Sequence, residues 1–175
     1  MLWIAFIALM MLSGCAPGKI NHIYADSRYQ PERMSHIPYS RGLGVKVSGS
    51  AFDMPQEEFE KIVNDAVQAP GYTSNPQAQP YIRMAFNNNV GLSFQNACNA
   101  QGGAAPAGKK SGDVGLVAVL CQGGDTLTYL TASLDDVEGP QDEKFHEFLR
   151  YVTVRLFPSQ TDETRENDCV VSPGC

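Results

Sequence analysis

Two stretches with strand-like composition, joined by a short glycine-containing turn, constrain the fold of this chain most. The run GLVAVLC, from Gly115 to Cys121, is continuously apolar and rich in β-branched residues. Such a run is typical of a strand that is covered on both faces. The turn sequence QGGD follows, and TLTYLTASL then returns as a second strand. The sequence therefore predicts a β-hairpin over residues 115–134.

Three further segments have the spacing of regular elements. GLGVKVSG (residues 42–49) and YIRMAFN (residues 81–87) alternate apolar with small or polar residues, which predicts two strands. Between them, Asp53 can cap a helix that carries Pro55 in its first turn and ends at Pro70-Gly71. One face of this predicted helix is apolar: Phe59, Ile62, Val63, Ala66 and Val67.

A second helix is predicted after the hairpin. Asp142 and Glu143 open it, and Pro158 ends it. Its apolar face comprises Phe145, Phe148, Leu149, Val152 and Leu156. The order of elements predicts an α+β fold over residues 42–160: a two-layer sandwich with about four mainly antiparallel strands and two helices on one face. Residues 161–175 form a polar C-terminal tail in this interpretation.

The N-terminus carries an apolar run of eleven residues, Leu2 to Leu12. A membrane-spanning helix needs about 20 apolar residues, so this run has the length of a secretory signal instead. It leads into Leu12-Ser13-Gly14-Cys15, which resembles the lipobox of bacterial lipoprotein precursors. Met1-Leu2-Trp3 departs from the usual pattern because it carries neither Lys nor Arg. The alternative is an ordinary signal peptide or a short buried helix, with Cys15 as a structural thiol.

The resemblance implies a processing pathway and a location. The Cys15 thiol would take a diacylglyceryl group, the Gly14–Cys15 bond would be cut, and residues 1–14 would leave as a signal peptide. Two or three acyl chains on Cys15 would anchor the protein permanently. Because Ala16 and not Asp follows Cys15, we expect the outer membrane, facing the periplasm.

The segment 15–41 shows no periodicity and contains three prolines, so we expect a flexible tether after the lipidated residue. Fully extended, it would reach about 80 Å from the membrane. The alternative is that its tyrosines, Tyr24, Tyr29 and Tyr39, pack on the domain or on a partner.

Four cysteines follow Cys15: Cys98, Cys121, Cys169 and Cys175. An even number in an exported chain favours disulfides, and three pairings are possible. We favour Cys98–Cys121 with Cys169–Cys175, the first joining the ends of two adjacent strands. We predict no metal site, because no pair has C-x-x-C spacing and no histidine is near.

No catalytic set or cofactor site is predicted. GAAPAGKKS (residues 103–111) nearly matches a phosphate-binding loop, but Lys110 replaces the hydroxyl residue and no helix follows. The acidic stretch DDVEGPQDE lacks the spacing of a calcium loop and is interpreted as a solvated connection. His146 has charged neighbours at helical spacing and no G-x-S-x-G serine to act on.

We therefore expect a non-enzymatic, lipid-anchored binding or accessory subunit of an envelope complex. The net charge of −6 makes nucleic acid an unsuitable partner. The domain resembles small envelope lipoproteins of unassigned function and accessory subunits of export machines. An edge strand and the loops Tyr72–Pro80 and Gln101–Ser111 are the expected partner contacts.

Two other functions remain open. A carrier of lipid or another hydrophobic ligand would need an apolar cavity, and a hydrolase would use His146. The cavity would be lined by Ile82, Met84, Phe86, Phe145 and Phe148.

Overall fold

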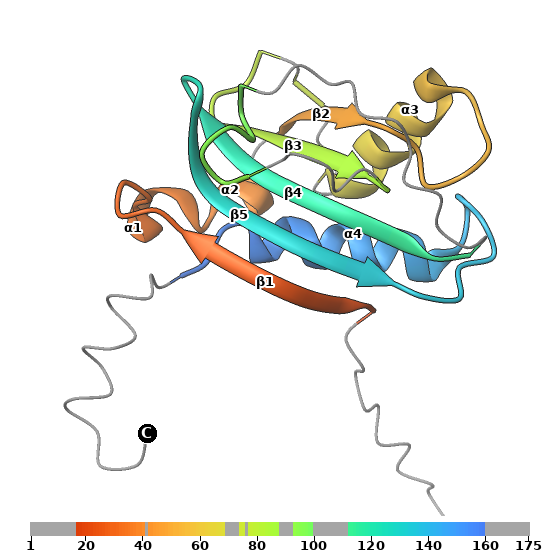
Figure 1. Ribbon diagram of the computed structural model, residues 1–175. Coiled ribbons are helices and arrows are strands. Elements are labelled where there is room, and N and C mark those ends of the chain that lie inside the picture. The colour runs from red at the N-terminus through yellow and green to blue at the C-terminus, as the bar shows by residue number, and fades with distance from the viewer. Residues whose placement is uncertain are drawn as a thin grey trace, which may run out of the picture.

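The structure is a computed structural model that describes residues 17–40, 42–68, 74–75, 77–87, 93–99 and 112–159. The strands are β1 (Lys19–Ala25), β2 (Gly44–Ser48), β3 (Tyr81–Phe86), β4 (Val114–Gln122) and β5 (Asp125–Leu134). The helices are α1 (Pro31–Met34), α2 (Ile37–Ser40), α3 (Gln56–Val67) and α4 (Glu143–Arg155). The described residues thus form a mixed α/β fold around one sheet (Figure 1).

The five strands lie in the order β1-β5-β4-β3-β2. All neighbouring pairs are antiparallel except β2 and β3, which are parallel. The chain passes from β2 through α3 to β3, and such a crossover is what parallel neighbours require. Our expectation of about four strands is one too low, because β1 was not recognised.

The predicted hairpin is confirmed as β4 and β5, which pair from Val114↔Leu134 to Gln122↔Asp125. Gly123 and Gly124 form the turn with φ of +60° and +96°, a backbone region that glycine enters without steric cost. All of β4 except Gln122 is buried, as expected for a strand covered on both faces.

The main core lies between the sheet and the helices α3 and α4. Residues of the predicted helix faces, among them Phe59, Val63, Phe145 and Phe148, are buried against the sheet. The rings of Phe59 and Phe86 meet edge to face with centroids 4.8 Å apart. The prediction that Asp53 caps α3 is wrong: the N-cap position is Pro55, and no side chain caps this helix.

A second, smaller cluster lies on the opposite face of the sheet. It comprises Tyr81, Ala85, Ala97, Cys98, Val117, Val119 and Cys121, with Tyr129 packed against it. Alternation along β4 divides the strand between the two clusters, since Leu116, Ala118 and Leu120 belong to the main core.

The expectation that residues 15–41 form a flexible tether is wrong for the part that the structure describes. Residues 19–25 pair with β5 as edge strand β1, and Tyr29 is only 2% exposed. The Tyr29 hydroxyl donates to the carbonyl of Pro158, 2.9 Å away, so the segment is fastened to the end of α4. Burial raises the pKa of Tyr29, as expected for a phenol removed from water.

Candidate functional site

The candidate site is built around a short segment, residues 93–99, that is tied to the sheet face opposite the one that α3 and α4 cover. A disulfide joins Cys98 to Cys121 near the end of β4, with 5.7 Å between their Cα atoms. Cys121 is fully buried and Cys98 is 8% exposed. The disulfide is the one that we favoured, but it does not join two strand ends, because Cys98 lies in a turn segment.

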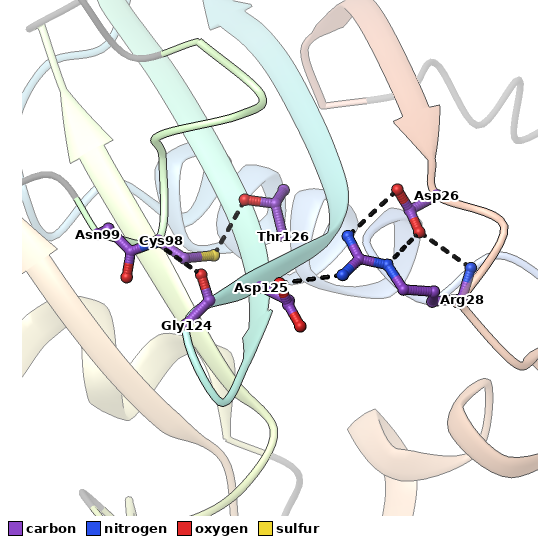
Figure 2. Close-up of polar contacts among 7 residues, drawn as sticks. All are labelled: Asp26, Arg28, Cys98, Asn99, Gly124, Asp125 and Thr126. Atoms are coloured by element: carbon purple, nitrogen blue, oxygen red, sulfur yellow. Dashed lines mark hydrogen bonds and ion pairs between the residues drawn. The ribbon is translucent and has the colours of Figure 1, made fainter.

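Three side chains hold the same segment by hydrogen bonds. Thr126 donates to the Cys98 sulfur at 3.2 Å, and the Tyr81 hydroxyl donates to the Cys98 carbonyl at 3.4 Å. Asn99 donates through Nδ2 to the Gly124 carbonyl at 3.0 Å, which reaches the β4–β5 turn (Figure 2). Residues 93–99 are therefore fixed at one end of the hairpin by covalent and polar contacts.

Aromatic side chains extend this surface onto the edge strand. The rings of Tyr24 in β1 and Phe94 meet edge to face with centroids 4.6 Å apart. His22 approaches Tyr129 of β5 at 6.5 Å between ring centroids. Tyr24 is 41% exposed and its neighbour Ile23 is 40% exposed, so apolar surface remains open to solvent on β1. We call the β1 residues His22–Ala25 together with Phe94 the edge surface.

Arg28 connects the segment after β1 to the β4–β5 turn. Its Nε lies 2.7 Å from Asp26, and its Nη1 lies 2.9 Å from Asp125 (Figure 2). The hydrogen bonds from Arg28 hold the pKa of Asp26 below its usual range. Arg28 and Asp125 are more than half exposed, so this network orients the loop more than it stabilises the fold.

The described site thus combines exposed aromatic rings, an edge strand and an arginine paired with two aspartates. Among the described residues, no group of His, Cys, Asp and Glu is arranged to hold a metal ion. Sequence reasoning missed the Tyr24–Phe94 and Arg28–Asp125 contacts because both join segments far apart in the chain. The local Asp26-x-Arg28 spacing was the one available signal.

His146 and residues of the acidic stretch form hydrogen bonds around the start of α4. His146 shares a hydrogen bond through Nε2 with the Pro140 carbonyl at 2.9 Å. Asp142 caps the helix by accepting from the Lys144 amide at 2.9 Å. Lys144 Nζ in turn donates to the Asp135 carbonyl at 2.6 Å. These contacts fit a structural connection between β5 and α4.

The residues that would line a ligand cavity are packed against one another. All five are at most 1% exposed and belong to the main core: Ile82, Met84, Phe86, Phe145 and Phe148. The rings of Phe86 and Phe145 have centroids 6.2 Å apart. These side chains therefore fill the space between sheet and helices in the way that core residues do.

Several predicted site residues lie outside the described residues. These are Gly14, Cys15, Cys169, Cys175 and the loop 101–111. Within the described ranges, none of the helices combines the length and apolar character needed to cross a bilayer. No protein-family model, curated protein or solved structure matches this chain.

Proposed function

We propose that the protein is an envelope lipoprotein, anchored through Cys15 to the outer membrane and facing the periplasm. The observation that carries this proposal is the sequence Leu12-Ser13-Gly14-Cys15 directly after a short apolar run. The thiol supplies the nucleophile for diacylglyceryl transfer, and the small residues before it admit the peptidase. Acyl chains buried in the bilayer contribute about 0.8 kcal/mol per CH₂ group.

The Cys98–Cys121 disulfide supports an oxidising compartment. Disulfides persist in secreted and periplasmic proteins and are rare in the cytosol of mesophiles. Here the bond fastens residues 93–99 to the sheet. A periplasmic location would keep the bond formed.

The proposed role is that of a binding or accessory subunit that has no catalytic function. In this proposal the domain is a two-layer α+β sandwich whose helices pack on one face of the sheet, and the partner binds at the sheet edge that β1 forms. The partner is an envelope protein that adds an extended segment to β1. Support comes from the position of β1 at the end of the sheet and from its exposed Ile23 and Tyr24. Edge strands of this kind accept strands from other chains.

Metabolic labelling tests the anchor. Cells that express the full precursor should incorporate radioactive palmitate into the wild type and into a Cys169→Ser control, and not into Cys15→Ser. Sedimentation of the membranes should place the wild type with the outer membrane. Label retained by Cys15→Ser would show that the acylated residue is another one.

Crosslinking in intact cells, followed by affinity capture, tests the binding role. Tyr24→Ala should lose a partner that the wild type captures, because Tyr24 lies in the edge surface. Tyr39→Ala is the matched control, since Tyr39 is a more exposed tyrosine, at 63%, outside that surface. Equal capture by both variants would contradict the assignment of the edge surface.

A further inference from the structure

The folded body begins very close to the proposed lipid anchor. Gly18 is packed so tightly that a Cβ atom there would lie 2.5 Å from Cδ2 of Phe148 and 3.0 Å from the Ser133 carbonyl. Lys19, the next residue, already pairs with Ser133 of β5. Gly18 stands three residues after Cys15 in the sequence.

The length of chain between Cys15 and Gly18 limits how far the domain can lie from the bilayer. Three residues span at most about 10 Å when fully extended. The headgroup layer on one side of a bilayer is roughly 5–8 Å thick, taken as half the difference between total and hydrocarbon thickness. A lipid on Cys15 sits beneath that layer, so crossing it uses most of the connection.

We propose that the end of the domain where β1 begins rests against the lipid headgroups. This end comprises Gly18, Lys19 and the connection between β5 and α4, residues 135–142, which lies at the same end of the sheet (Figure 1). The inference rests on the proposed acylation of Cys15. It replaces the reach of about 80 Å expected for a flexible tether.

The bilayer contact is imposed by the anchor and not by attraction of charges. Asp135, Asp136 and Glu138 are exposed at this end and outnumber the one exposed lysine there, Lys19, while Lys144 is engaged with the Asp135 carbonyl. Carboxylates are repelled by the negative surface potential of anionic lipids. A zwitterionic surface is therefore the lipid chemistry that this end fits best.

The contact also determines where the candidate site lies. β5 has ten residues between its Asp125 end and its Leu134 end. At about 3.3 Å per residue, the β4–β5 turn is about 30 Å from the bilayer end of the sheet. The disulfide and Arg28 lie near this turn, so a partner would meet them up to about 30 Å above the bilayer surface.

Fluorescence quenching by lipids tests the placement. The one tryptophan of the chain is Trp3, which leaves with the signal peptide, so an introduced tryptophan is a unique reporter. Gly139→Trp places it in the β5–α4 connection, where a Cβ meets no atom within 4 Å. Gln122→Trp places it at the exposed far end of β4. Both proteins are purified from cells expressing the precursor and reconstituted in phosphatidylcholine vesicles with a headgroup nitroxide.

The fraction of fluorescence quenched should be roughly twofold or more greater at residue 139 than at residue 122, given about 30 Å between the two ends of β5. A flexible 24-residue Gly/Ser insertion between Ala16 and Pro17, about 25–30 Å in mean reach, should remove most of that difference. Equal quenching at the two positions, or an insertion without effect, would overturn the inference.

Mass spectrometry of the N-terminal peptide separates this result from a failure of the proposed function. A diacylglyceryl group on Cys15 with no preferential quenching at residue 139 overturns the placement alone. A Cys15 without lipid overturns the proposed function and the placement with it. Circular dichroism of each variant confirms that the fold is retained before quenching is compared.

Discussion

Removal of the Cys98–Cys121 disulfide should lower the free energy of unfolding substantially. The perturbation is the double variant Cys98→Ala/Cys121→Ala, which removes both sulfurs without placing a hydroxyl at the fully buried Cys121 position. The two cysteines are 23 residues apart in the chain. Their bond therefore restricts a loop of that length in the unfolded state.

The magnitude follows from the entropy of loop closure. With n = 23, the relation −2.1 − 1.5R ln n gives about −11 cal/mol/K, or about 3.4 kcal/mol at 25 °C. For a chain of this size, each kcal/mol shifts Tm by roughly 2–4 °C, so Tm should fall by roughly 7–14 °C. The hydrogen bond from Thr126 to the Cys98 sulfur is lost at the same time, which acts in the same direction.

Urea unfolding followed by circular dichroism measures this loss. The control is Cys169→Ala/Cys175→Ala, which leaves the Cys98–Cys121 bond in place. Wild type treated with dithiothreitol should unfold like the Cys98→Ala/Cys121→Ala variant. A loss below about 1 kcal/mol would refute the argument, because it would mean that the cross-link restricts the unfolded chain far less than its loop length requires.

Three further predictions concern local contacts. Phe145→Ala should lower the free energy of unfolding by about 3–5 kcal/mol, because the ring is fully buried in the main core, whereas Val154→Ala, at an exposed position, should have little effect in the same urea titration. Asp142→Ala should cost about 1 kcal/mol by removing the α4 cap, and Asp142→Asn should recover most of that loss. Arg28→Ala should raise the pKa of Asp26 part of the way towards its ordinary value, because the side-chain hydrogen bonds are lost while the backbone N–H of residue 28 still donates to the carboxylate; an unchanged carboxyl titration by NMR would contradict this cause.

The edge strand β1 shows why part of the fold could not be predicted. A bulge between Ile20 and His22 shifts the register, so that Ile20 faces Ala132 and Ile23 faces Leu130. Both partners belong to the main core. The two isoleucines are thus three residues apart on a strand, which breaks the period of two that identifies strands. The same strand is largely exposed, so no continuous apolar run compensates.

The candidate site depended still more on tertiary structure. Tyr24 meets Phe94 and Arg28 meets Asp125 across large separations in sequence, and neither residue type indicates its partner. The Cys98–Cys121 pairing was one of three possibilities by sequence. Only the return of residues 93–99 over the sheet brings these two sulfurs together.

The sequence by itself determined the β4–β5 hairpin, the strands β2 and β3, and the two long helices, because periodic burial marks each of them locally. The tertiary structure decided that the chain from Gly18 onward belongs to the folded body. That outcome depends on pairing with β5, more than a hundred residues away in the sequence. The edge of β5 that does not face β4 supplies hydrogen bonds to β1, whose own side chains carry almost no strand signal.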